Sequence, residues 1–167
     1  MLRKIKSWNV YVQGKGYAGK AEDFNEPKLS RKVEGFRGAG MNVEVEEDMG
    51  MEKMESDFTL REVAPEIMKE WGACSSDQTS IVLRKAVQKE GSCESDAHEV
   101  FLRGILKEID MGTTKSGDAT KHKYMFTLRY YKYVINDEVI IEIDAENMIE
   151  MVDGVDILKS QRDAIGL

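Results

Sequence analysis

The chain has 167 residues, of which 41% are hydrophobic and 33% charged, with a net charge of −7 and a mean hydropathy of −0.46. This composition is typical of one globular domain spanning residues 1–167 and excludes a disordered chain. Neither an apolar run of the roughly 18 residues that a membrane helix needs nor the apolar core of a signal peptide is present, so we expect a cytosolic protein that does not insert into membranes.

Alternation of apolar and polar residues, the period of a β-strand, dominates the first part of the chain. Val10 and Val12 mark a first strand, and Pro27 breaks the run that follows it. The glycine-rich segment 36–42 leads into an acidic strand around residues 42–50. Four residues at a two-residue period then predict one face of a further strand: Met54, Ser56, Phe58 and Leu60.

Long strands are predicted around residues 80–88, 99–110 and 123–135. Outside these strands, residues 73–98 are hard to assign and contain the expected variable loops. After the turn residues Asn136 and Asp137, three alternating residues are expected to face the core: Val139, Ile141 and Ile143.

The strand before that turn has no clearly polar face. Strict alternation places Leu128, Tyr130 and Val134 on one side. It places Tyr131, Tyr133 and Ile135 on the other. Both faces of this strand are therefore expected to pack against another part of the protein or against another chain.

Two segments are predicted to be helical. Pro65 suits a first helical turn, and the short helix that it opens ends by Gly72. At the end of the chain, Asp153 can cap a helix from about Val155 to Ile165.

Charge is distributed unevenly along the chain. Residues 1–40 carry a net charge of +5, whereas residues 41–60 carry −6 and residues 136–156 carry −8. These segments can be solvated strand faces. Alternatively, surfaces of opposite sign on identical copies can attract each other head to tail and fix the register of an assembly.

No group of residues predicts catalysis, a cofactor or a metal site, so we expect a protein that is not an enzyme. His98 and His122 lie outside any metal-ligand spacing and are expected at the surface. Acidic pairs in two strands could serve as glycosidase carboxylates, but a solvated strand face is the better interpretation. Cys74 and Cys93 are expected to be free thiols.

Six segments, in order along almost the whole chain, resemble the major tail tube protein of contractile-tailed phages and of related phage-tail-like bacteriocins. They are NVYVQGKGYAGKA, EPKLSRKVEGFRGAGM, DMGMEKMESDFTL, FLRGILKEIDMGTTKSGD, TLRYYKYVINDEVIIEID and NMIEMVDGVDILKSQRDAIGL. The resemblance implies a mainly β subunit, a β-sandwich or barrel with one short flanking helix and a C-terminal helix. This architecture is related to that of type VI secretion tube proteins.

The resemblance also implies a structural virion protein without catalysis. Hexameric rings would stack into the inner tube of a contractile tail, which conducts DNA and is driven through the cell envelope when the sheath contracts. The expected partners are other copies of the chain, the tail sheath protein, the baseplate and tail-terminator proteins, and the tape-measure protein in the lumen. DNA would pass without specific binding, which an acidic lumen would favour. The tube would be assembled in the bacterial host cytoplasm and located in the virion.

Two sets of contact residues follow from the resemblance. An extended hairpin around residues 28–50 corresponds to the segment with which family members hold the adjacent ring. Its candidate contacts are Lys28, Arg31, Lys32, Phe36, Arg37, Gly38, Gly40, Met41, Glu44, Glu46, Glu47 and Asp48. Neighbouring subunits would also share one continuous sheet, which could cover the second face of the tyrosine-rich strand. The candidates for this contact are Tyr130, Tyr131, Tyr133, Ile141 and Ile143.

Other functions are compatible with a β-rich chain. The tube protein of a type VI secretion system or of a phage-tail-like bacteriocin would form similar rings. A small-ligand-binding β-barrel of the lipocalin type would instead be a monomer with an internal cavity.

Overall fold

The computed structural model describes residues 1–74 and 78–167, so the part of the expected loop region at 75–77 lies outside the described residues. The strands are β1 (Arg3–Val12), β2 (Lys15–Gly16), β3 (Ala21–Asn25), β4 (Arg31–Phe36), β5 (Val45–Met51), β6 (Met54–Leu60), β7 (Thr79–Lys89), β8 (Ser95–Asp110), β9 (His122–Ile135), β10 (Glu138–Asp144), β11 (Ile149–Val152) and β12 (Val155–Asp156). The helices are α1 (Pro65–Met68) and α2 (Lys159–Ile165). The chain is therefore mainly β, as predicted.

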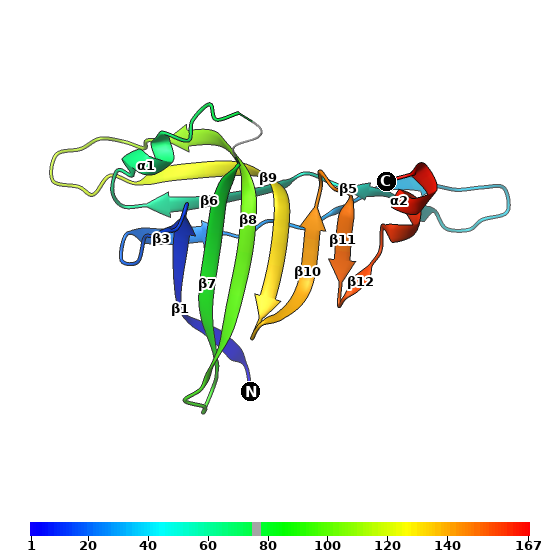
Figure 1. The fold of residues 1–167 in the computed structure, drawn as a ribbon, viewed down its shortest axis with the longest axis horizontal. Coiled ribbons are helices and arrows are strands. Elements are labelled where there is room, and N and C mark those ends of the chain that lie inside the picture. Colours follow the sequence, from blue (N-terminus) through cyan, green and yellow to red (C-terminus); the bar gives the residue numbers. More distant parts are fainter. Residues whose placement is uncertain (75–77) are drawn as a thin grey trace.

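The strands form two layers that cross each other (Figure 1). In the large layer, the strand order is β12-β11-β10-β9-β8-β7-β1-β2. In the small layer, β6 pairs with β3 on one side and with the first half of β9 on the other. β8 and β9 are long enough to contribute to both layers, as in sandwiches whose strands bend from one sheet into the other.

The long β8–β9 ladder bends where its register shifts, between Arg103 and Gly104. A Cβ atom on Gly104 would lie 2.1 Å from the carbonyl oxygen of Thr127. Only glycine permits this approach of the two backbones. Gly104 thus allows the ladder to pass from the large layer into the small one.

Aromatic rings fill the space between the layers. Phe58 lies at the centre, with its ring centroid 5.7 Å from those of Phe24 and Tyr124 and 5.8 Å from that of Phe126. The predicted apolar face of β6 is confirmed, because its four residues are all buried. Aliphatic side chains of the large layer, such as Val10 and Leu102, complete this core.

β-Bulges change the predicted faces of β9 and β10. The register shift opposite Gly104 leaves Arg129 unpaired, so Leu128 and Tyr131 both belong to the core, and the prediction that they face opposite sides is wrong. A second shift at Ile140 turns Val139 outward, where it is 40% exposed. Strict alternation fails here because each bulge inserts one residue and reverses the faces after it.

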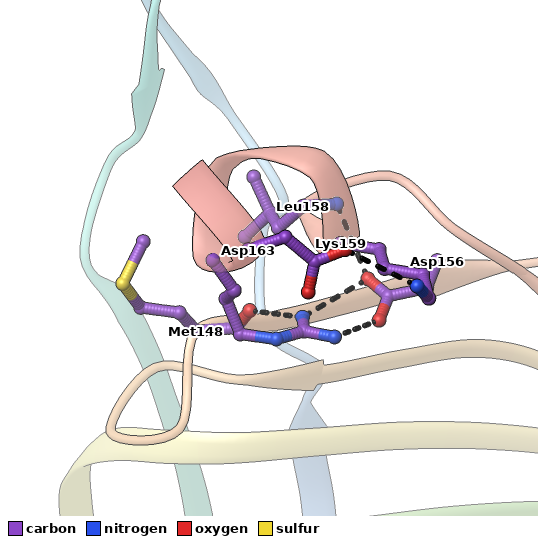
Figure 2. Close-up of polar contacts among 6 residues, drawn as sticks. Met148, Asp156, Leu158, Lys159 and Asp163 are labelled. Carbon is purple, nitrogen blue, oxygen red and sulfur yellow. Dashed lines mark hydrogen bonds and ion pairs between the residues drawn. The ribbon is translucent and has the colours of Figure 1, made fainter. Parts of the chain in front are cut away.

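The predicted helix beginning at Pro65 is confirmed, with proline in its first turn. The C-terminal helix is shorter than predicted: residues 155–156 form β12, and Asp153 adopts a φ of 51° in the turn before that strand. Asp156 binds the start of this helix instead, because its carboxylate accepts a hydrogen bond of 3.2 Å from the backbone N–H of Leu158 (Figure 2). None of the described helices is long and apolar enough to cross a membrane.

Both histidines differ from the expectation of a surface position. His122 is only 5% exposed at the start of β9. His98 is partly buried, and its Nδ1 lies 2.7 Å from the hydroxyl of Tyr133. Burial lowers the pKa of His98, so the imidazole is neutral at pH 7.

Candidate assembly surfaces

The β4–β5 hairpin is the part of the structure least connected to the core. It forms a two-stranded sheet of its own, and its loop extends to one end of the molecule (Figure 1). No core residue lies between positions 28 and 50. An isolated two-stranded sheet is at best marginally stable in water, so this hairpin is a surface that a further chain could stabilise.

Apolar side chains of the hairpin are exposed to solvent. Phe36 is 57% exposed and Val45, its partner across the ladder, is 52% exposed. Val43 in the loop is 69% exposed. These exposed apolar side chains make the hairpin a candidate contact surface.

Local hydrogen bonds shape the hairpin loop. The backbone N–H of Met41 donates to the carbonyl of Gly38 at 3.2 Å, and Nε of Arg37 donates to the carbonyl of Met41 at 3.1 Å. Gly40, with a φ of 83°, adopts a conformation that favours glycine. These candidates therefore form a turn, and the side chain of Arg37 closes it.

The acidic candidates extend along β5. Glu47 lies directly opposite Glu34 of β4, and such a pair of like charges destabilises a hairpin in the absence of a cation. No described residue forms an ion pair with Glu44, Glu46 or Glu47. This acidic strand can therefore accept cations from another molecule.

Arg31, expected as a contact to another ring, has ion-pair partners within its own subunit. Its guanidinium group binds both carboxylate oxygens of Glu150 on β11, and Nε lies 3.6 Å from Asp48. The side chain of Glu150 is only 7% exposed, whereas that of Arg31 is 40% exposed. Arg31 thus attaches the base of the hairpin to its own subunit, while Asp48 contacts this arginine from the opposite strand of the hairpin. The basic contacts that remain available are Lys28, Lys32 and Arg37.

A pocket of about 760 Å³ lies next to this ion pair, between the base of the hairpin and α2. Four methionines line it: Met49, Met51, Met54 and Met148. On its far side, Arg162 of α2 binds Asp156 with both terminal nitrogens and donates to the carbonyl of Met148 at 2.7 Å (Figure 2). The pocket separates two surface elements and lies outside the aromatic core, unlike the internal cavity of a ligand-binding barrel.

Four of the five candidates for a shared sheet belong to the subunit's own interior. Tyr131 and Ile143 are part of the core, and Tyr133 and Ile141 pack against it. β9 has a neighbouring strand on both sides, and β11 pairs with residues 141–144 of β10, so the candidate residues themselves offer no free backbone edge to another copy. The tyrosine-rich strand is thus covered on its inner face by the small layer of the same subunit.

Tyr130, the fifth candidate, lies on the outer face of the large layer. The guanidinium of Arg103 lies 4.1 Å from its ring centroid, and its hydroxyl donates to Glu142 at 2.7 Å. Burial, and then this hydrogen bond, raise the pKa of Tyr130 to about 12. The same face carries Lys132 at 5.0 Å from the ring of Phe101. Cation–π pairs therefore cover the outer face of the tyrosine-rich strand, for which the sequence indicated no cover.

Sequence reasoning missed two features of these surfaces. The Arg31–Glu150 pair joins residues 119 positions apart, and no local pattern signals it. The free edge of β1 was also missed, although the sequence shows that this strand begins with three basic residues: Arg3, Lys4 and Lys6.

Comparisons with known proteins identify relatives of this chain. The family model for phage tail tube protein FII matches residues 2–166. The tail tube protein of Escherichia phage P2 is 36% identical over 170 residues, covering 100% of this chain and 99% of that protein. The major tail tube protein of Serratia phage KSP20 is 31% identical over 154 residues, covering 91% of this chain and 88% of that protein.

Solved structures give weaker matches. Hcp1 from Flavobacterium johnsoniae has a TM-score of 0.48 and 13% identity, covering 82% of this chain and 98% of that one. A chain of the anti-feeding prophage baseplate has a TM-score of 0.49 and 9% identity, covering 76% and 90%. The match over residues 2–166 and the two phage relatives confirm the resemblance seen in the sequence. The chain belongs to the phage tail tube protein FII family and has a structural role in a tail tube.

Proposed function

We propose that copies of this chain form hexameric rings, and that the β4–β5 hairpin of each copy holds the adjacent ring in the inner tube of a contractile tail. The observation that carries this proposal is the hairpin itself, a separate two-stranded sheet with Phe36, Val43 and Val45 exposed. In a monomer these apolar side chains stay exposed to water and the acidic strand has few cations near it. A stacked ring would bury the apolar side chains and bring basic residues to the acidic strand.

The tube would serve as a conduit for DNA and as the rod that the sheath drives through the cell envelope. The net charge of −7 supports passage of DNA without specific binding, because like charges keep the phosphate backbone from adhering. Sheath, baseplate, tail-terminator and tape-measure proteins would be its partners, with assembly in the host cytoplasm. A phage tail is favoured over a type VI secretion system because relatives from phages P2 and KSP20 match along most of the chain.

Deletion of residues 36–42 tests the role of the hairpin. Because the segment 28–50 contributes nothing to the core, the subunit is expected to keep its fold, its rings and its circular dichroism spectrum, while stacking fails. A second variant keeps the length of the loop and removes its apolar side chains by Phe36→Ser, Met41→Ser and Val43→Ser. It is expected to form rings that do not stack.

Negative-stain electron microscopy and size-exclusion chromatography with light scattering measure the outcome. The wild-type chain should form rings and tubes of uniform diameter at high concentration. A wild-type chain that stays monomeric at every concentration and salt would refute ring assembly. Long tubes of normal appearance from both hairpin variants would refute the assignment of this hairpin to the contact between rings.

A further inference from the structure

We infer that, within one ring, the basic outer edge of β1 contacts the acidic edge formed by β10–β12 of the neighbouring copy. This inference rests on the proposed ring assembly and assigns the two surfaces that close the ring. These edges lie at opposite sides of the large layer (Figure 1).

β1 offers an open backbone edge. It pairs with β7 along its length but with β2 only at Tyr11 and Val12. Residues 3–9 therefore have no strand on their outer side among the described residues. Such an edge is a template for pairing with another chain, and proteins cover it or protect it by charge.

The exposed charges of this edge are positive. Lys4 and Lys6 are exposed and form no ion pair with any described residue. Arg3 is held by Asp96 at 3.1 Å. On nearby β3, Glu22 is neutralised by Lys121 at 2.8 Å. The two lysines thus remain free to pair with another chain, as do two exposed acids nearby, Asp23 on β3 and Glu90 after β7, which form no ion pair with a described residue.

The opposite edge is acidic. Residues 136–156 contain eight acidic residues and no lysine or arginine. Most of these carboxylates have a partner within the subunit, such as Arg162 for Asp156. The carboxylates of three have neither an ion-pair nor a hydrogen-bond partner among the described residues: Asp137, Glu138 and Asp153.

These three acids lie at the same end of the sheet as the two lysines. The strand register links the positions step by step across the layer. From Glu138 the successive pairs run through Ile135, His98 and Lys85 to Trp8, which lies four residues from Lys4 along β1. The N–H of Asp153 then donates to the carbonyl of Ile140 at 3.0 Å. A rotation axis tilted relative to the strands, as closure of a sheet into a ring requires, would bring lysines and acids of neighbouring copies to one level.

Apolar side chains also lie at both edges. Ile5 on β1 is 54% exposed, and Val155 on β12 is 65% exposed. Both belong to the inner side of the large layer, where Ile5 pairs with Val87 and Val155 with Val152. Contact between the edges would bury this apolar rim, which gives the association a hydrophobic contribution besides the charges.

The charges also determine the symmetry of the contact. A two-fold dimer would place like edges together, lysines against lysines or acids against acids, which costs free energy. Only a head-to-tail contact joins unlike edges, and such contacts close into rings when the rotation allows.

Charge reversal tests the assignment. Lys4→Glu with Lys6→Glu reverses the basic edge. Glu138→Lys with Asp137→Asn and Asp153→Asn reverses the acidic edge, and asparagine tolerates the positive φ at positions 137 and 153. Each variant is expected to need at least about tenfold more protein to form rings, because two or three exposed pairs are lost at every interface. A chain that carries both sets of changes should regain ring formation.

The matched control is Lys69→Glu with Lys115→Glu, which changes the net charge by the same amount as the basic-edge variant. Both lysines are exposed, lie outside the two edges and form no ion pair with a described residue. Light scattering and electron microscopy report the rings, and circular dichroism reports the fold. Should an edge variant unfold, the salt dependence of wild-type ring formation replaces it, and rings should weaken as salt rises.

The outcomes separate this inference from the proposed function. Suppose that the wild-type chain forms rings and the edge variants form them at the same protein concentration, or that the doubly reversed chain forms rings no better than the single-edge variants. Either result would overturn the assignment of these edges and leave ring assembly intact. Wild-type ring formation that is independent of salt would also overturn it. A wild-type chain without rings would overturn the proposed function itself.

Discussion

Removal of the Arg31 side chain should destabilise the monomer even though Arg31 lies in a protruding hairpin. Its guanidinium group is the only ion-pair partner that Glu150 has among the described residues. Arg31→Ala would leave this carboxylate, 7% exposed, without a counterion. Breaking a fully buried pair costs about 3–5 kcal/mol, whereas an exposed pair contributes about 0–1 kcal/mol.

The expected loss in the free energy of unfolding for Arg31→Ala lies between these limits. Arg31 is 40% exposed, and the adjacent pocket of about 760 Å³ gives water access to the site. We therefore expect a loss of about 2 kcal/mol in the free energy of unfolding. With an m-value of about 2 kcal/mol/M, the midpoint of urea unfolding should fall by about 1 M.

Urea unfolding followed by circular dichroism, at a dilution where the protein is monomeric, measures this loss. Lys32→Ala is the matched control, because Lys32 is exposed and forms no ion pair with a described residue; it should change stability by less than about 0.5 kcal/mol. The double variant Arg31→Met with Glu150→Leu should recover most of the stability. The reasoning would be refuted if Arg31→Ala unfolded at the same urea midpoint as the wild type. It would also be refuted if the double variant lost as much free energy of unfolding as the two single variants together.

Three further predictions concern the fold, its titration and its cysteines. Gly104→Ala should cost several kcal/mol in thermal or urea unfolding, because the new methyl group would meet the carbonyl of Thr127; a wild-type midpoint would show that the ladder can relax there. Burial raises the pKa values of Tyr130 and Tyr131 to about 12, above the value of about 10 in an unfolded chain. Their contribution to stability is therefore complete below about pH 10 and is lost as the pH rises through about 12. Spectrophotometric titration should show tyrosines that ionise late, of which Tyr131→Phe removes one; ionisation of all six tyrosines together near pH 10 would contradict this. Because both cysteines are exposed and free, thiol reagents and chelators should leave ring formation unchanged in electron microscopy, and loss of rings on adding EDTA would reveal a metal site.

Local patterns in the sequence determined the strands and most of their faces. Alternation at a two-residue period correctly predicted β6 and the long strands, and Pro65 correctly marked the start of α1. The two-residue turn at Asn136 and Asp137 also occurs, with positive φ at both residues. These features depend on neighbours in the chain, because backbone sterics and the pleat fix them within a few residues.

The β-bulges were decided by the tertiary structure. Arg129 is inserted where β9 follows the bend of the sandwich, and Ile140 is inserted near the start of β10; each insertion exchanges inner and outer faces. Alternation places Tyr130 and Tyr131 on opposite faces, but nothing in the sequence shows that Tyr130 lies outside and Tyr131 in the core. Their difference arises from pairing with strands that are distant in the chain.

The tertiary structure also decided which residues far apart in the chain contact each other. Sequence reasoning grouped Arg31 with the other basic residues of the hairpin, but only the folded chain brings it to Glu150 on β11. The sequence shows that residues 136–156 are acidic and that β1 begins with basic residues, yet it cannot show that both lie at one end of a sheet on opposite edges. Strand order and register set this arrangement, because they depend on contacts between residues far apart in the chain.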